Sequence, residues 1–411
     1  MAEDRWKSQA WWKLPVYTGD VSGVCSALYE LGGMVIMHDP SGCNSTFNTH
    51  DEIRWYDHDS LIFITGLNEM EAIMGSDEAL IRDITEAARI YWPSFIAIAN
   101  SPIPYITGMD LEAVSRLIEQ ETNIPAFYIP TNGMHDYVRG AGLAFLHLAQ
   151  RFVTAPKSDR SRDLQTGLLR CNIIGMTPLD FASPESLHSL RKKISKAGME
   201  IISCWAMEDS LDHICQSGEA DVNLVVSSAG LPAAEYMQNA FGIPFVAGFP
   251  AHGTEELYFA AVRESVKTGS SRFPFRDRTC TQSKENCRDG SPCAVNEPGD
   301  TQADRDCVCL IGESVIMTSL AASIERRTGV KTHVFGAAEN GEIFLGTEDA
   351  ALSGEEELSK ALLKLMPSRV VADPCYGDLL PEGTELIRLP HLAFSGRIFL
   401  QEIPDLMNFA P

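Results

Sequence analysis

Two cysteines near the N-terminus combine a reactive side chain with positions where parallel α/β sheets bind ligands. Cys25 lies in GDVSGVCSALYEL, a glycine-containing turn that leads into an expected helix, and Cys43 lies in the turn DPSGC after the expected strand MVIMH. Ligands of such sheets gather at the carboxyl ends of strands, and amides at a helix start stabilise thiolates. Two thiolates are half of the four that usually hold a [4Fe–4S] cluster, and a symmetric dimer would supply the rest. The alternative is that both cysteines pack as small apolar residues.

Three side chains near these turns are candidates for proton transfer. His38 and Asp39 end the strand before Cys43, and His135 lies in a glycine-containing loop. Histidine titrates near neutral pH, which suits proton delivery coupled to electron transfer. The alternative for each is a structural hydrogen bond. Weaker candidates are the histidines of the Trp/Asp-rich loop and three residues at later strand ends: His50, His58, Cys204, His252 and Cys375.

Five more cysteines occur in or directly after a segment rich in Gly, Ser, Asp and Arg: Cys280, Cys287, Cys293, Cys307 and Cys309. None of their spacings is the CxxC of a standard metal site. Cys307 and Cys309 are two apart on an expected strand, so their side chains should point to the same face. A second metal site, a disordered or redox-labile loop and a packing role remain alternatives.

Charge and hydropathy exclude several classes of protein. The 411 residues include 33 Lys and Arg against 56 Asp and Glu, a formal net charge of −23. This balance disfavours nucleic acid or an anionic membrane as the main partner. No apolar run reaches the roughly 18 residues of a membrane span, and the N-terminus lacks the apolar core of a signal peptide. Eleven cysteines at this density fit a reducing compartment, so a cytoplasmic protein is expected.

Short apolar runs alternate with amphipathic stretches along the whole chain, as in βαβ units with parallel sheets. We expect three Rossmann-like α/β domains: residues 1–157 with the two cysteines, 168–268, and 307–411, with 269–306 as an insertion or linker. The expected strands are 34–38, 61–67, 95–101 and 126–130, then 171–177, 200–206, 222–228 and 244–250, then 307–314, 332–338, 369–375 and 385–391. No GxxxxGK[ST] or GxGxxG motif occurs, so another chain is expected to handle any ATP or nicotinamide.

The order of several segments resembles the nitrogenase component 1 family. GVCSALYELGGMVIMHDPSGC resembles that family's cluster-binding segment, in which a cysteine precedes a strand and an H-G-P-x-G-C turn. LIFITGLNEMEAIMGSDEALIRDI, IPTNGMHDYVRGAGLAF, CNIIGMTP and HLAFSGRIFLQEI resemble later segments in the family's order. The resemblance extends from about residue 17 to 404, apart from the insertion, and implies that Cys25 and Cys43 are cluster ligands.

Three departures indicate which branch the chain resembles. Nitrogenase has a third cluster cysteine where this sequence has Asn100 and Ser101, so the resemblance implies a four-iron cluster in place of an eight-iron one. Val226 lies near the place of the cysteine that holds nitrogenase's catalytic cofactor, and His391 is shifted from that cofactor's histidine. We therefore expect no nitrogenase-type cofactor and a closer likeness to small nitrogenase-like reductases with two cysteines per chain.

The resemblance implies an oxygen-sensitive oxidoreductase that works with other chains. A separate ATP-dependent iron protein would deliver low-potential electrons to a [4Fe–4S] cluster shared across a dimer interface, and a small-molecule substrate would lie between the domains. The dimer is either a homodimer or a heterodimer with a sister subunit. A non-catalytic scaffold for assembling a metal cofactor is the main alternative, and a Rossmann-type binding protein with incidental cysteines is a third.

Overall fold

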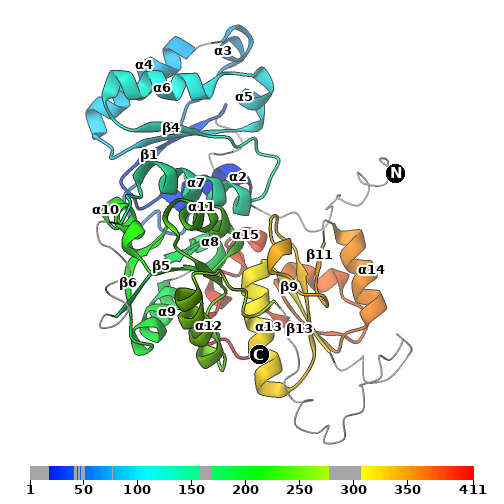
Figure 1. Ribbon diagram of the computed structural model, residues 1–411. Helices are drawn as coiled ribbons and strands as arrows, with labels where there is room; N and C mark the ends of the chain where they lie inside the picture. Colours follow the sequence, from blue (N-terminus) through cyan, green and yellow to red (C-terminus); the bar gives the residue numbers. More distant parts are fainter. Residues whose placement is uncertain are drawn as a thin grey trace, which may run out of the picture.

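The computed structural model describes residues 18–40, 44, 47, 51–75, 77–156, 168–182, 184–276, 307–352 and 354–411. Their strands form three sheets, and every described strand pairing is parallel. Figure 1 shows the first unit at the top in blue and cyan, with the green second unit and the yellow-to-red third unit below it. The prediction of three Rossmann-like units with parallel sheets is confirmed. Among these described residues, no helix has the length and apolarity needed to cross a bilayer.

The first sheet has the strand order β2-β1-β3-β4 and carries helices on both faces. Met34 and Ile36 pack on the side of α4 and α6, whereas Val35 and Met37 pack on the side of α2 and α7, as alternation along a strand requires. The strands are β1 (Met34–His38), β2 (Leu61–Ile64), β3 (Ile96–Asn100) and β4 (Ala126–Ile129). The helices are α2 (Asp20–Leu28), α3 (Glu69–Met74), α4 (Asp77–Tyr91), α5 (Pro102–Thr107), α6 (Leu111–Thr122) and α7 (Tyr137–Phe152).

The second sheet has the order β6-β5-β7-β8. Its strands are β5 (Leu169–Ile174), β6 (Met199–Cys204), β7 (Val222–Val225) and β8 (Phe245–Ala247). Its helices are α8 (Pro178–Phe181), α9 (Pro184–Lys196), α10 (Leu211–Cys215), α11 (Leu231–Phe241) and α12 (Glu255–Thr268). The start of the expected insertion adds to this unit, because Arg272 forms a parallel bridge with Val246 and Phe275 is buried.

The third sheet has the order β11-β10-β9-β12-β13. Its strands are β9 (Val308–Gly312), β10 (Thr332–Gly336), β11 (Ala350–Ala351), β12 (Arg369–Ala372) and β13 (Glu385–Arg388). Its helices are α13 (Ser314–Thr328), α14 (Glu355–Leu365) and α15 (Leu392–Ser395). The two-residue strand β11 is an addition to the expected strands, because its apolar run is too short for a period-2 pattern.

The turn expected around Cys25 is instead part of a helix. Helix α2 starts at Asp20, so Cys25 lies in its second turn. Gly23, which reads as a turn residue, is a packing residue: a Cβ there would lie 2.2 Å from the carbonyl oxygen of Tyr137 in α7. A Cβ at Gly140 of α7 would lie 1.8 Å from Asp20 O. The two glycines let the backbones of α2 and α7 approach more closely than side chains would allow.

Arg54 ties the first unit to the second. Its guanidinium donates to both carboxylate oxygens of Glu52, at 2.7 and 2.8 Å, and to Glu30 Oε1 at 2.8 Å. The same group donates to the carbonyl oxygen of Ala206, at the end of the second sheet, at 2.8 Å. The Glu52 side chain is 2% exposed, so Arg54 neutralises a carboxylate that water scarcely reaches.

Replacing Arg54 by Ala should destabilise the protein by about 3–5 kcal/mol, because Glu52 would remain buried without its counter-charge. Chemical denaturation followed by circular dichroism measures the change. Arg116→Ala is the matched control, since Arg116 pairs with Glu112 on an exposed helix face and should cost less than about 0.5 kcal/mol. Equal midpoints for the two variants would contradict this account of Arg54.

Candidate functional site

The loops at the carboxyl end of the first sheet are fixed by a buried carboxylate, Asp20. Its Oδ2 accepts from the backbone N–H of Asn132 and its Oδ1 from that of Gly133, both at 2.9 Å. Burial raises the pKa of Asp20, and the backbone donors oppose that shift. The first residue of α2 thereby holds the loop that precedes α7.

The same loop joins the first unit to the third. His135 Nδ1 lies 3.1 Å from both carboxylate oxygens of Glu339, and Glu339 N donates to Asp136 Oδ2 at 2.7 Å. Burial raises the pKa of Asp136 to about 6, and the neighbouring Glu339 carboxylate contributes to the shift. His135 therefore pairs with a carboxylate of another unit at the meeting of the two units.

A cavity of about 380 Å³ lies where the three units meet. The first unit contributes Asp20, Val21, Ser22 and Gly133, the second contributes Leu179, and the third contributes Leu392 and Arg397. Asn44, Phe47 and Asp51, which follow Cys43 in the chain, also line it. Its volume is at the lower end of the roughly 300–1,000 Å³ typical of small-molecule sites.

Directly beside this cavity, one carboxylate contacts side chains from the other two units. The Tyr137 hydroxyl donates to Asp180 Oδ1 at 2.5 Å, and His391 Nε2 lies 3.3 Å from the same oxygen. The exposed fractions of Tyr137, Asp180 and His391 are 0%, 3% and 5% in that order. Tyr137 begins α7, Asp180 lies in α8 and His391 precedes α15, so each unit supplies one member.

A second buried acid lies close to this group. Glu313 accepts hydrogen bonds from Ser228 N at 3.0 Å, from the Ser228 hydroxyl, and from Ile316 N at 2.9 Å. Burial raises the pKa of Glu313, and the charge of Asp180 adds to the rise. The junction therefore concentrates titratable groups away from water, an arrangement typical of functional sites.

Cys25 is fully buried among the apolar residues between the first sheet and α7. Burial raises the pKa of its thiol, and the Glu52 carboxylate adds to the rise. Cys43 lies outside the described residues. In the part of the chain that the structure describes, no group of three or more His, Cys, Asp or Glu side chains is arranged to hold a metal ion. The described donor set for a cluster is thus a single thiol.

His38 and Cys25 lie on opposite faces of the first sheet. His38 lines a second cavity together with Ile36 and Leu80, on the α4 side. Cys25 packs with Val35 and Met37 on the α2 side. Asp39 follows His38 and is 2% exposed, and its backbone N–H donates to Thr65 Oγ1 at 3.2 Å. The structure does not bring His38, His135 and Cys25 into one group.

The remaining cysteine and histidine candidates occupy scattered positions. Cys307 and Cys309 are buried and joined by a thiol hydrogen bond, which raises the pKa of Cys309 and places both side chains on one face, as their spacing predicts. Cys204 is buried and Cys375 half-buried, whereas His58 and His252 are exposed. Four other candidates lie outside the described residues: His50, Cys280, Cys287 and Cys293.

Sequence reasoning did not find the Tyr137–Asp180–His391 group. Its members are separated by 43 residues or more and belong to three different units, so no local motif connects them. His391 drew notice only as a shifted counterpart of a family histidine. The one local signal was the pattern of Pro178 and Asp180 in the first turn of a helix after a strand.

Comparison with known proteins places this architecture in a family. The family model for nitrogenase component 1 type oxidoreductases matches residues 22–257. The chain is 25% identical over 221 residues to the nitrogenase iron-molybdenum cofactor biosynthesis protein NifE of Methanosarcina barkeri, covering 52% of this chain and 46% of that protein. It is 25% identical over 231 residues to a subunit of the light-independent protochlorophyllide reductase of Synechococcus sp. (strain JA-3-3Ab), covering 54% and 45%.

The solved structure of nitrogenase Cp1 at pH 5 shares the fold, with a TM-score of 0.59 at 14% identity, over 93% of this chain and 85% of that one. The chain matches about half the length of the two curated relatives. Because the family model spans more than half of the sequence, the chain belongs to the nitrogenase component 1 type oxidoreductases.

Proposed function

We propose that this chain is the electron-accepting component of a nitrogenase-like reductase. It would hold a [4Fe–4S] cluster through Cys25 and Cys43 and bind a small substrate in the cavity between the three units. The observation that carries the proposal is the lining of that cavity. Val21 and Ser22 precede Cys25 by about one helical turn, Asn44 directly follows Cys43, and all three line the cavity.

Two cysteines per chain give half of a cluster's usual ligands, so a second chain would provide the other half. That chain is either another copy of this one or a sister subunit. When bound, the cluster would supply low-potential electrons, received from an ATP-dependent iron protein. This chain's own contribution is a cavity whose walls are held in place, because Asp20 and the pair His135–Glu339 fix its loops.

The junction suits a reaction that consumes protons as well as electrons. Asp180 accepts the Tyr137 proton in a hydrogen bond and lies next to His391, and Leu179 and Leu392, their chain neighbours, line the cavity. Asp180 and His391 are thus placed to hold protons within one residue of the cavity wall, and Tyr137 is hydrogen-bonded to Asp180. This favours a reductase over a scaffold, since a scaffold needs no proton store.

Cys25→Ala and Cys43→Ala should each remove most of the iron from protein purified without oxygen, together with the absorbance and electron paramagnetic resonance of the cluster. Cys171→Ala is the matched control, since Cys171 is equally buried but lies in the second sheet. It should keep its iron. Full iron content in Cys25→Ala would exclude this residue as a ligand.

Asp180→Asn should lower the free energy of unfolding by about 1.5–3 kcal/mol, because hydrogen bonds to a charged acceptor are replaced by weaker neutral ones. Asp212→Asn, at an exposed position of α10, should change it by less than about 0.5 kcal/mol. Urea denaturation measures both variants. A midpoint for Asp180→Asn equal to that of the control would show that the junction does not depend on this carboxylate.

The reductase and scaffold alternatives differ in what happens after cluster loading. With an ATP-dependent iron protein, MgATP and dithionite, a reductase cluster should take up an electron only when MgATP is present. After re-oxidation with added ferricyanide it should be reduced again without leaving the protein. Rapid-mixing absorbance of the loaded protein measures this. Transfer of iron to an acceptor protein without ATP-dependent reduction would instead support the scaffold.

A further inference from the structure

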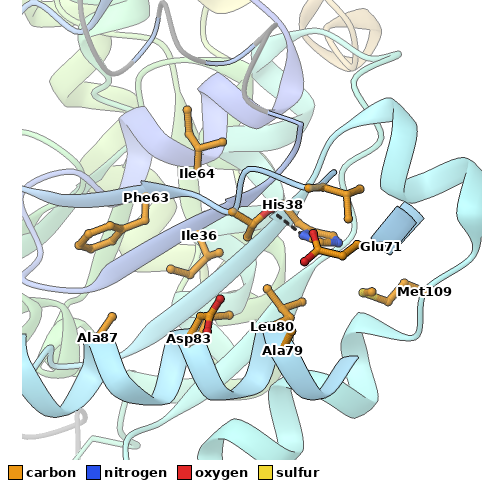
Figure 2. Close-up of a pocket in the computed structure, with 13 residues that line it drawn as sticks. Ile36, His38, Phe63, Ile64, Glu71, Ala79, Leu80, Asp83, Ala87 and Met109 are labelled. Carbon is orange, nitrogen blue, oxygen red and sulfur yellow. Dashed lines mark hydrogen bonds between the residues drawn. The ribbon is translucent and has the colours of Figure 1, made fainter. Parts of the chain in front are cut away.

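The second cavity, of about 260 Å³, lies in the first unit between α4 and the sheet. Figure 2 shows Ile36 and Phe63 extending from the strands toward Leu80 and Ala87 on the helix, with His38 and Glu71 at one end. Most of the wall is apolar, and its volume is just below the range of drug-sized sites. The cavity can hold a small organic molecule.

His38 has an unused nitrogen in the wall of this cavity. Its side chain is part of the lining and the residue is 2% exposed, and Nε2 has no hydrogen-bond partner among the described residues. An unsatisfied buried polar atom costs about 1–3 kcal/mol, so such atoms are rare in folded proteins. A bound molecule that hydrogen-bonds to Nε2 would remove this cost.

The hydrogen bonds around Thr65 determine what Nε2 offers. His38 Nδ1 lies 2.9 Å from Thr65 Oγ1, and that hydroxyl donates to the carbonyl oxygen of Asp39 at 3.3 Å. A hydroxyl has one proton, so His38 Nδ1 carries the ring proton and donates it to Thr65. Burial lowers the pKa of His38 and so favours the neutral ring, against the charges of Asp39 and Glu71. Nε2 is then a bare acceptor for an N–H or O–H group.

The charges at the cavity select the sign of its ligand. Glu71 and Asp83 both line it, and no Lys or Arg occurs among the described lining residues. Asp83 is exposed and pairs with Arg82 at 3.0 Å, so Glu71 is the carboxylate that a ligand would meet. Figure 2 shows the Glu71 carboxylate beside the His38 ring. One oxygen of Glu71 accepts a hydrogen bond from Asn68 N at 3.1 Å, which leaves the carboxylate with further capacity to accept. An anion would be repelled here, whereas a cation would be attracted.

We propose that this cavity binds a small apolar organic cation, namely a protonated amine on an aromatic or aliphatic body. The amine donates one N–H to His38 Nε2 and is neutralised by Glu71, and its apolar body lies between Ile36, Phe63 and Leu80. The site is separate from the proposed cluster, because Cys25 lies on the other face of the sheet. Failure of one proposal therefore leaves the other standing.

Three probes whose polar atom lies at the same number of bonds from the ring test the ligand class by isothermal titration calorimetry on the full chain: 2-phenylethylamine, 2-phenylethanol and phenylacetate. The amine should bind most tightly and the alcohol more weakly, and the carboxylate should not bind. Equal affinity of amine and carboxylate, or no binding of the amine, would overturn the proposal.

Two substitutions separate the roles of the polar groups. Glu71→Gln should weaken amine binding about tenfold, the value of one hydrogen bond to a charged group, and leave alcohol binding unchanged. His38→Leu should weaken both amine and alcohol. Glu78→Gln, on an exposed position of α4, is the matched control and should change neither.

Ala87→Phe tests the location, because the added ring fills the cavity and should abolish binding of both amine and alcohol. Thermal unfolding of each variant checks that it is folded. Amine binding that survives in folded Ala87→Phe would show that the probe binds elsewhere and would overturn the assignment of the cavity.

Discussion

The arrangement of the three units depends on a carboxylate that water scarcely reaches. Asp180 accepts hydrogen bonds from Tyr137 of the first unit and from Thr177 of its own unit, and His391 of the third unit lies 3.3 Å from it. A relative shift of the first and second units would remove the Tyr137 hydrogen bond from this buried carboxylate, which is costly. The shape of the cavity beside this group therefore depends on how the three units are held together. The pairs Arg54–Ala206 and His135–Glu339 restrain the same units at their edges.

Glycine has an equally direct role in the first unit. Gly23 and Gly140 let α2 and α7 approach at backbone distance, and this contact places Asp20 against the loop after β4. A single methyl group at either position would push the helices apart. The cavity wall formed by the first turn of α2 thus depends on the absence of two side chains.

The sequence predicted the sheets well, because strands buried on both faces are continuous apolar runs and punctuation by Gly, Pro and Asp marks their ends. The strand 34–38 was predicted at its observed bounds, and the three parallel units are confirmed. The turn predicted around Cys25 was wrong, because a packing glycine inside a helix and a turn glycine look alike in sequence. The group of Tyr137, Asp180 and His391 could not be predicted from the sequence, since these residues meet only through tertiary packing. The resemblance of segments to a known family predicted the family correctly, and that inference depended on their order rather than on any one residue.

Strand β1 is a partition with a different chemistry on each side. Its even-numbered residues Ile36 and His38 face α4, while its odd-numbered residues Val35 and Met37 face α2. A substitution at an even-numbered residue of β1 therefore alters the α4 side of the sheet and leaves the α2 side nearly unchanged. A substitution at an odd-numbered residue does the opposite. Evolution could in this way change which ligands fit the cavity on the α4 side, while the residues packed on the α2 side are selected independently. A deletion of one residue within β1 would have the reverse effect, exchanging the two sets of side chains at once.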